Sequence, residues 1–376
     1  MSAKDSIATP QGGGGLSTES SDADVVLQED AAQAATALGD AAATLEGCTI
    51  LLSGGAGFLG AALLDTIMHL NVTRFTKSAR VVVVDNFVTG VPERLQRAAR
   101  DPNVEVVQAD IIRELDVQQP FQYAIHAASI ASPIIYRAQP LQTVDVNVWG
   151  LRRMLELARS QRDLRGFLFF STSEIYGDPD PANIPTREDY RGYVSCTGPR
   201  ACYDESKRFG ETLAVIYHQE FGFPIRSVRP FNVYGAGQRT DDGRIIPDLV
   251  RAAVRGSPLV LHSDGSATRS FCYVSDASAG FLLAMLRGKP GEAYNIGNAR
   301  EVSIRDLANL VSSISGTPVR FEVSKDPHYL TDNPQRRCPD LTKARADLGY
   351  QPSVTLEVGV RRTLRWASAM AEKGTQ

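Results

Sequence analysis

The sequence predicts an α/β protein in which a doubly wound parallel sheet carries a smaller second lobe. Short apolar segments alternate with helical patterns from Cys48 to about residue 235, and a glycine-rich turn joins the first apolar segment to the first helix. Strands that alternate with helices form βαβ units, and these units build parallel sheets. The chain of 376 residues also exceeds the size at which one hydrophobic core keeps growing, so two lobes are expected.

The N-terminal segment divides into two parts. Residues 1–25 are rich in Ser, Gly, Thr and Asp, and we expect them to form a disordered tail. Residues 26–47 predict a helix, because leucines and alanines recur at helical spacing, with Asp24 available as the N-cap and Gly47 as the stop. This helix would either form an interface between subunits or pack on its own domain.

The main sheet is predicted from five short apolar segments, at residues 49–53, 79–85, 104–108, 123–127 and 166–171. Helical patterns lie between them, for example at 58–70 and 143–160. Together they define a domain over residues 48–235. Beyond it Pro, Gly and short helices dominate, so residues 236–376 are expected to form mainly a smaller mixed α/β lobe, with some segments returning to the main sheet.

Composition and charge exclude several classes of protein. The formal net charge is −3, no basic block indicates a nucleic-acid partner, and no apolar run approaches the roughly 20 residues that span a bilayer. The five cysteines are scattered without metal-ligand spacing, so we expect no metal site and five reduced thiols. No basic region followed by an apolar one opens the chain. We therefore expect a cytoplasmic protein that enters no membrane.

The strongest local motif is the turn after the first predicted strand. Its residues are Gly54, Gly55, Ala56, Gly57, Phe58, Leu59 and Gly60. Gly54 can make the tight turn, Gly57 lets a pyrophosphate approach the backbone, and Gly60 lets the helix pack close to the sheet. The N-terminus of the helix then faces the phosphate charge. This context predicts a Rossmann-type dinucleotide site.

The nature of the dinucleotide is predicted from Asp85, which ends the second strand. A carboxylate at this place accepts the ribose hydroxyls of NAD and repels a 2′-phosphate. No arginine follows directly to receive such a phosphate, so NAD is predicted as the cofactor rather than NADP. Asp110 follows the next strand, and it either holds an adenine amino group or caps its own strand end.

Tyr203 and Lys207 lie four residues apart and therefore share one face of a predicted helix. A phenol is a poor base at neutral pH, but a neighbouring ammonium group stabilises the phenolate and lowers its pKa. Such a pair can remove a proton from a substrate hydroxyl while hydride leaves the same carbon. Thr172 ends another predicted strand 31 residues earlier and adds weight to this interpretation.

With these motifs the chain resembles the extended short-chain dehydrogenase/reductase family over roughly residues 48–370. The segments that further carry the resemblance are His126-Ala127-Ala128, Asn147 within Val-Asn-Val-Trp-Gly, residues 229–235 and residues 269–276. The resemblance implies an NAD-dependent enzyme that acts on a nucleotide sugar. The cofactor contacts that it implies are Gly54, Gly57, Phe58, Leu59, Gly60, Asp85, Asn86, Asp110, Ile111, Ala127, Ala128, Asn147, Tyr203 and Lys207.

The reaction class is indicated by residues 171–177. Ser173 and Glu174 stand where a 4,6-dehydratase of this family needs an Asp-Glu pair, and a simple 4-epimerase needs no glutamate there. A hydroxyl followed by glutamate resembles the UDP-glucuronate decarboxylases, most closely over residues 198–208, with 188–190 and 333–337 also similar. This resemblance implies oxidation of UDP-glucuronate at C4, loss of carbon dioxide from the β-keto acid and return of the hydride, which gives UDP-xylose.

The roles follow from that chemistry. Tyr203 would be the base for the C4 hydroxyl, with Lys207 as its electrostatic partner and Thr172 as a hydrogen-bond donor to the forming ketone. Glu174 would assist ring distortion or proton delivery, or else is a structural carboxylate. The predicted catalytic residues are Thr172, Ser173, Glu174, Tyr203, Lys207 and Arg269, and the predicted substrate-binding residues are Ser129, Asn232, Arg244, His262, Arg269 and Arg337.

Several alternatives stay open. Arg269 would bind the diphosphate or the carboxylate, and Arg337 would bind phosphate or form a surface ion pair. Decarboxylases usually carry an aromatic residue and a glycine where this chain has His262 and Ser263, so the base is either not uracil or held differently. The alternative activities are a 4-epimerase, a decarboxylase of another nucleotide or nucleoside uronate, an arrested decarboxylase that releases NADH, and an NAD-binding regulator. The resemblance also implies a homodimer, formed by helices around 143–160 and 201–221.

Overall fold

The computed structural model describes residues 21–113, 115, 117, 119–322 and 334–374. Its largest element is a seven-stranded sheet in the order β11-β6-β5-β4-β1-β2-β3, in which every neighbouring pair is parallel. The strands are β1 (Thr49–Ser53), β2 (Arg80–Asp85), β3 (Val104–Gln108), β4 (Tyr123–His126), β5 (Gly166–Phe170), β6 (Ile225–Pro230) and β11 (Ala293–Ile296). The predicted doubly wound sheet is confirmed, and the five predicted strands differ from the observed ones by at most one residue at either end.

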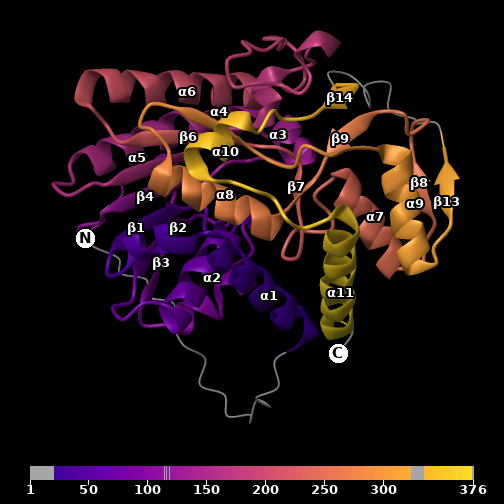
Figure 1. Cartoon of the computed structure of the whole chain (residues 1–376), viewed down its shortest axis with the longest axis horizontal. Helices are drawn as coiled ribbons and strands as arrows, with labels where there is room; N and C mark the ends of the chain where they lie inside the picture. The colour runs from indigo at the N-terminus through magenta and orange to yellow at the C-terminus, as the bar shows by residue number, and fades with distance from the viewer. Residues whose placement is uncertain (1–20, 114, 116, 118, 323–333, 375–376) are drawn as a thin grey trace.

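Helices cover both faces of this sheet (Figure 1). They are α2 (Phe58–Thr73) and α8 (Val274–Arg287) on one face, and α5 (Leu151–Arg159) and α6 (Ala201–Phe221) on the other. Along β1, Ile50 and Leu52 pack with the first pair of helices, whereas Leu51 packs with the second pair. Because all seven strands are parallel, their carboxyl ends meet at one edge, where ligands bind in doubly wound sheets.

The helix predicted at residues 143–160 is confirmed over residues 143–159, but the structure inserts a π-helical turn that the sequence pattern does not predict. The helix consists of α4 (Pro140–Asp145), the π-helical turn η4 (Val146–Gly150) and α5. Asn147 lies in the π-helical turn, where its side chain is fully buried. A single π-helical turn inside a longer helix is often found at functional sites, because it redirects a side chain.

The N-terminal helix α1 (Asp22–Ala37) begins four residues before the predicted residue 26 and leads into the 3₁₀ helix η1 (Gly39–Leu45). Its N-cap is Ser21 rather than Asp24, because the Ser21 hydroxyl accepts a hydrogen bond from the backbone N–H of Asp24 at 3.4 Å. The rest of the predicted tail, residues 1–20, lies outside the described residues.

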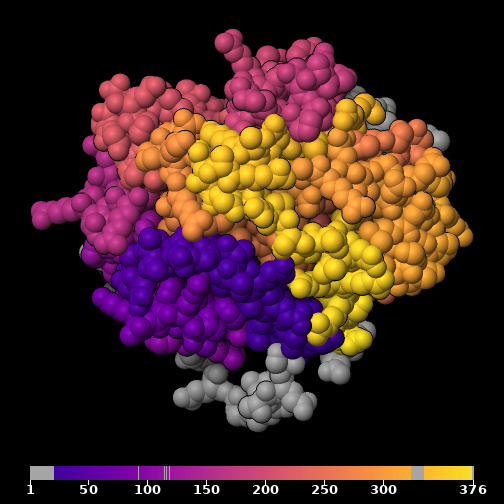
Figure 2. Space-filling view, in the orientation of Figure 1, coloured from indigo at the N-terminus to yellow at the C-terminus, as the bar shows by residue number. Residues whose placement is uncertain are grey.

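Helix α1 packs on its own chain, against α2, α8 and the last helix, α11 (Leu356–Gly374). Figure 2 shows the indigo surface of α1 beside the yellow surface of the C-terminal segment. Asp30 of α1 is buried, accepts a hydrogen bond from the Tyr273 hydroxyl at 2.8 Å and pairs with Arg362 at 3.2 Å. Of the two alternatives for this helix, the structure thus shows the intrachain packing.

The smaller lobe contains three short sheets, which lie to the right of the main sheet in Figure 1. Its elements are α7 (Ile245–Val254), α9 (Ile304–Ser315), β7 (Val233–Tyr234), β8 (Leu259–Leu261), β9 (Thr268–Ser270), β10 (Cys272–Tyr273), β12 (Glu301–Ser303), β13 (Val319–Phe321) and β14 (Arg336–Arg337). Two segments beyond residue 235, β11 and α8, belong to the layers of the main sheet. The exact division between the two lobes at residue 235 remains a prediction.

Short helices complete the described part of the chain. They are η2 (Pro92–Leu95), η3 (Ala98–Arg100), α3 (Pro133–Ala138), η5 (Ser173–Tyr176), η6 (Pro181–Asn183) and α10 (Thr342–Leu348). The most important for the site is η5, because only two residues separate it from the end of β5, at the carboxyl edge of the sheet. None of the helices in the described residues is long and apolar enough to cross a membrane.

Candidate active site

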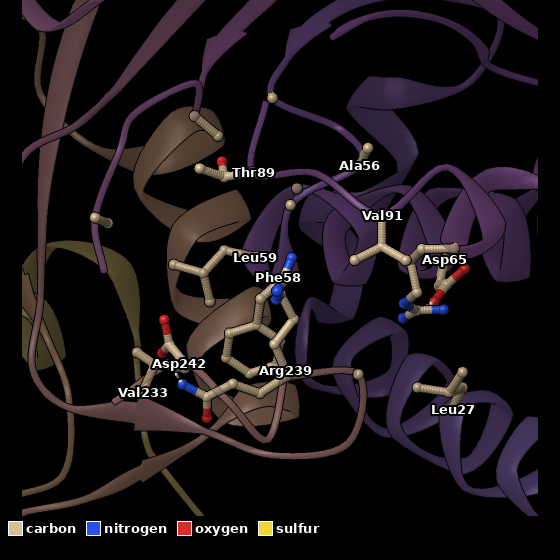
Figure 3. A pocket seen from close by; sticks show the side chains of 18 of the residues that line it. Leu27, Ala56, Phe58, Leu59, Asp65, Thr89, Val91, Val233, Arg239 and Asp242 are labelled. Atoms are coloured by element: carbon tan, nitrogen blue, oxygen red, sulfur yellow. Dashed lines mark hydrogen bonds and ion pairs between the residues drawn. The ribbon is translucent and has the colours of Figure 1, made fainter. Parts of the chain in front are cut away.

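A cavity of about 2090 Å³ opens at the carboxyl edge of the sheet, between the two lobes. Figure 3 shows part of its wall, where Phe58 and Leu59 begin α2 and Arg239 lies close to Phe58. The predicted residues that line the cavity are Gly54, Gly57, Phe58, Leu59, Gly60, Ala127, Ser129, Thr172, Ser173, Glu174, Tyr203, Lys207, Asn232 and Arg244. The structure thus brings together residues from both predicted lobes.

The glycine turn has the geometry that a dinucleotide requires. Gly54 has φ of +78°, and a Cβ atom there would lie 2.5 Å from the backbone nitrogen of Ala128. A Cβ atom at Gly60 would lie 2.1 Å from the carbonyl oxygen of Gly54, so α2 can approach the turn only because both residues are glycines. Gly57 is the N-cap of α2 and supplies no side-chain cap, which leaves the first N–H groups of the helix for an anion.

Asp85 lies directly beside this turn and is 8 % exposed. Its carboxylate accepts hydrogen bonds from the backbone N–H groups of Ala56 at 2.9 Å and Phe87 at 2.8 Å. Burial raises the pKa of Asp85, and these two hydrogen bonds oppose the rise. Each oxygen keeps a second lone pair that a ribose hydroxyl can use. The residues present therefore fit NAD.

Three other predicted cofactor residues, Asp110, Ile111 and Asn86, make contacts within the protein. Asp110 accepts a hydrogen bond from the backbone N–H of Ile112 at 3.2 Å. This contact agrees with the interpretation that Asp110 caps its own strand end. Ile111 is buried in the core against Gly150. Asn86 accepts from the N–H of Val88 at 3.1 Å. None of these three lines the cavity formed by the described residues, so their contacts with a cofactor remain predictions.

Asn147 links the cofactor side of the cavity to helix α6. Its side-chain oxygen accepts a hydrogen bond from Ser129 at 2.7 Å, and its amide nitrogen donates to the hydroxyl of Ser206 at 2.9 Å. Ser206 in turn donates to the carbonyl of Tyr203 at 3.0 Å. This chain of buried hydrogen bonds fixes the first turns of α6, and therefore the place of Tyr203, relative to β4.

Tyr203 and Lys207 project from α6 into the cavity, as their spacing predicts. The ring of Tyr203 stacks on Tyr136, with 5.2 Å between the ring centroids. Lys207 donates to the carbonyl oxygen of Phe170 at 2.7 Å. Its ammonium nitrogen lies 6.0 Å from the centre of the Tyr203 ring. Thr172, the N-cap residue of η5, forms a hydrogen bond with Tyr203.

The expected lowering of the Tyr203 pKa by Lys207 is not what the structure shows. Burial raises the pKa of Tyr203, and the groups that oppose this rise are Arg244 and the hydrogen bond with Thr172. Burial also lowers the pKa of Lys207 to about 7. A lysine that is only partly protonated at neutral pH is a weaker electrostatic partner than the sequence pattern indicates. The charge of Arg244 compensates in part.

Glu174 lies at the first turn of η5, where Thr172 caps the helix by accepting a hydrogen bond from the N–H of Glu174 at 3.2 Å. One carboxylate oxygen of Glu174 accepts from Arg337, and the other accepts from Arg200. Burial alone would raise the pKa of Glu174, but the charges of Arg200 and Arg337 outweigh burial and lower it to about 2. Glu174 is therefore an anion at neutral pH.

The remaining substrate-binding candidates, Arg244, Arg269 and His262, differ in how far they are buried. Arg244 pairs with Asp242 and donates to the carbonyl of Ala131 at 2.7 Å. Arg269 is buried behind Glu174, and burial with the charge of Arg337 lowers its pKa to about 10. His262 is exposed at the end of β8 and does not line the cavity of the described residues. Its role in holding a nucleobase remains a prediction.

Two residues of the site were missed from the sequence. Tyr136 lines the cavity, stacks on Tyr203 and has a buried hydroxyl without a hydrogen-bond partner in the described chain. Arg200 lines the cavity and binds Glu174. A signal for Arg200 was present, because it precedes Tyr203 by three residues and therefore shares a helix face with it. Among the described residues, no group of three or more His, Cys, Asp and Glu side chains is arranged to hold a metal.

The sequence of this chain is similar to those of known enzymes. The model of a family described as the NAD-dependent epimerase/dehydratase family matches residues 50–297. UDP-glucuronic acid decarboxylase 3 of Arabidopsis thaliana is 39 % identical over 311 residues, which cover 83 % of this chain and 86 % of the relative. UDP-glucuronic acid decarboxylase 1 of Danio rerio is 36 % identical over 323 residues, which cover 86 % and 73 %.

Solved structures resemble the fold over nearly its whole length. One is the UDP-glucuronic acid 4-epimerase of Bacillus cereus in complex with UDP-glucuronic acid and NAD, with a TM-score of 0.71 and 26 % identity over 86 % of this chain and 99 % of that chain. Another is the UDP-glucose 4-epimerase of Thermotoga maritima with UDP-glucose, with a TM-score of 0.75 and 26 % identity over 87 % and 100 %.

Proposed function

This chain belongs to the NAD-dependent epimerase/dehydratase family, and we propose that it decarboxylates UDP-glucuronate to UDP-xylose without net redox change. The observation that carries this proposal is the place of Glu174, which lines the same cavity as Thr172 and Tyr203 and is held there by two arginines. The 36–39 % identity to relatives named UDP-glucuronic acid decarboxylase supports the same reaction.

The first step is oxidation at C4 of the sugar. Tyr203, as the phenolate, takes the proton of the C4 hydroxyl, and the Thr172 hydroxyl, which lies beside Tyr203, turns to donate to the oxygen that becomes a ketone. NAD, when bound, supplies the acceptor for the C4 hydride and later returns it. The C4 ketone is then β to the C5 carboxylate, so the bond to that carboxylate can break with its electrons delocalised into an enolate.

The second step is loss of carbon dioxide, which leaves the bonding electrons in the enolate, followed by protonation of C5 by a proton from water. Because its pKa is about 2, Glu174 is ionised at neutral pH and has no proton of its own to give. Of its two predicted roles, assistance to distortion of the sugar ring is therefore the one that we assign. Its negative charge also keeps Arg200 at a fixed position in the cavity wall, while Arg337 pairs with it from behind.

The proposal is tested by incubating the purified protein with UDP-glucuronate and NAD while product mass and absorbance at 340 nm are recorded. We expect a product lighter by one carbon dioxide, without accumulation of NADH. Loss of carbon dioxide with stoichiometric NADH would indicate an enzyme that releases its ketosugar. Unchanged mass with a new isomer would indicate a 4-epimerase, the activity named for the Bacillus cereus structure. Turnover only with other uronate nucleotides or nucleosides would mean that the substrate does not carry the UDP group.

We also propose that the protein is a homodimer, joined through α6 and the helices before it. Large apolar side chains are exposed along these neighbouring elements: Leu141 is 75 %, Trp149 55 %, Phe209 47 % and Ile216 43 % exposed. Contiguous exposed apolar surface of this kind is costly in water and usually marks an interface. Two such helical layers, one from each protomer, would form a four-helix interface.

The dimer is tested by sedimentation of the wild type and of a Phe209→Glu/Ile216→Glu variant. We expect the wild type to sediment as a dimer and the variant as a monomer, because two buried charges per protomer oppose the interface. The matched control is Val358→Glu, which changes an exposed apolar residue of α11 far from this surface. A monomeric wild type, or a dimer that survives both substitutions, would contradict the proposal.

The cytoplasm is the proposed location. All five cysteines are unpaired, and three of them, Cys48, Cys272 and Cys338, are buried. Reduced thiols are typical of proteins that remain in a reducing compartment.

A further inference from the structure

Two arginines share one carboxylate in the wall of the cavity. Arg200 and Arg337 each bind a different oxygen of Glu174, and their side chains are 12 % and 5 % exposed. The ion pair between Arg337 and Glu174 joins β14 to η5, and the ion pair between Arg200 and Glu174 joins η5 to the N-cap of α6. Both oxygens of Glu174 are thus committed to these guanidinium groups.

This pair of guanidinium groups has fewer acceptors than its buried N–H groups require. The Nε atoms of Arg200 and Arg337 are both buried and have no hydrogen-bond partner in the described chain. The other carboxylate near Arg200, that of Asp204, lies 3.6 Å from Nε, which is an ion-pair distance rather than a hydrogen bond. Buried donors of a charged group that lack acceptors are costly, and the charges of Arg200, Arg337 and Arg269 all act on the one carboxylate of Glu174, so the cluster favours a further anion.

Of these two arginines only Arg200 lines the cavity that the described residues form. It is the N-cap residue of α6, three residues before Tyr203, and it lies in the cavity wall with Thr172 and Glu174. A ligand that lies beside Tyr203 in this cavity can therefore contact Arg200 directly, whereas Arg337 is not part of the cavity wall of the described residues. Arg337 stands behind Glu174 and supports it from β14.

We propose that Arg200 is the residue that makes the site specific for a sugar with a carboxylate, because Arg200 is the member of the Arg200–Glu174–Arg337 cluster that lines the cavity and a carboxylate there would pair with the excess positive charge of the cluster. This inference rests on the proposed function, since it concerns the C5 carboxylate of the same substrate. A planar guanidinium group binds a carboxylate through two parallel hydrogen bonds, which a neutral hydroxymethyl group cannot replace. Arg200 thereby distinguishes a uronate from the corresponding hexose.

A matched pair of ligands tests this role. UDP-glucuronate and UDP-glucose carry the same base, the same diphosphate and the same ring, and differ only in the C5 substituent. Their ratio of dissociation constants therefore cancels any contribution of Arg200 to the diphosphate. The ratio is measured by calorimetry with NAD-loaded protein in a Tyr203→Phe background, which lacks the proposed base and does not consume the ligand.

We expect UDP-glucuronate to bind at least about tenfold more tightly than UDP-glucose, in line with a hydrogen bond to a charged group. Arg200→Met should remove most of this preference and lower affinity for the uronate about 10- to 100-fold, with little change for UDP-glucose. The control is Arg187→Met, which removes the same charge from a side chain that is 69 % exposed. The control should leave the ratio unchanged.

Two results would overturn the inference. The first is equal affinity of the Tyr203→Phe protein, with Arg200 intact, for the two ligands. This result does not depend on whether Arg200→Met folds. Equal losses of affinity for both ligands in Arg200→Met would mean that Arg200 serves the diphosphate or the fold. The proposed function is decided separately by carbon dioxide release from the unsubstituted enzyme, so a failure of one proposal is distinguishable from a failure of the other.

Discussion

Replacing Tyr203 with phenylalanine is expected to lower kcat for carbon dioxide release from UDP-glucuronate about 10³-fold, the usual contribution of a positioned proton acceptor. The ring would remain stacked on Tyr136, so the fold and the cavity should be retained. Only the hydroxyl, which forms a hydrogen bond with Thr172, is removed. Because the proton of the C4 hydroxyl then has no acceptor, hydride transfer stops at the first step, and bound NAD should stay oxidised.

The measurement is product mass under single-turnover conditions, together with the absorbance of bound NADH. Tyr193→Phe is the matched control, since Tyr193 is 79 % exposed and outside the cavity wall of the described residues. It should retain wild-type kcat. If Tyr203→Phe kept kcat within tenfold of the wild type, Tyr203 would not be the base, and Tyr136, whose buried hydroxyl has no partner in the described chain, would be the next candidate.

The features that the sequence predicts well are those that depend on neighbours in the chain. Four consecutive valines predict β2, and the strand–glycine turn–helix order predicts the cofactor side of the cavity. Tyr203 and Lys207 share a helix face because their spacing alone requires it. Backbone geometry of this local kind is nearly independent of the rest of the fold, so local patterns suffice.

The features that the sequence does not predict depend on contacts between distant segments. Arg337 meets Glu174 across 163 residues only because β14 pairs with β9 in the smaller lobe. The pKa of Tyr203 also departs from its local pattern, because burial, and not the spacing to Lys207, has the largest effect on it. The π-helical turn at Asn147 interrupts an apolar periodicity that reads as one continuous helix. In each case the tertiary packing overrides a local preference.

Glu174→Gln is expected to affect both stability and activity, because it leaves two largely buried guanidinium groups around a neutral amide. Removing one partner of a buried ion pair destabilises a protein by about 3 kcal/mol or more. Denaturant unfolding at neutral pH should show this loss, whereas Glu357→Gln, in a pair with Arg361 that is 58 % exposed on both sides, should change stability by less than about 0.5 kcal/mol. Carbon dioxide release by Glu174→Gln should fall at least about 100-fold, since Arg200 loses its fixed position in the cavity wall.

The pH dependence of that stability difference separates an ionised Glu174 from a protonated one. The pKa of Glu174 is lowered in the folded protein from 4.5 to about 2, so the folded state binds its proton less readily than the unfolded state. The stabilisation is therefore complete above the unfolded pKa and is lost as the pH falls from 4.5 towards 2. The gap between the wild type and Glu174→Gln should be constant from neutral pH down to about pH 5 and should narrow below it. A gap that instead widened on acidification would mean that Glu174 is protonated in the folded state, and it would return Glu174 to the role of the acid that protonates C5.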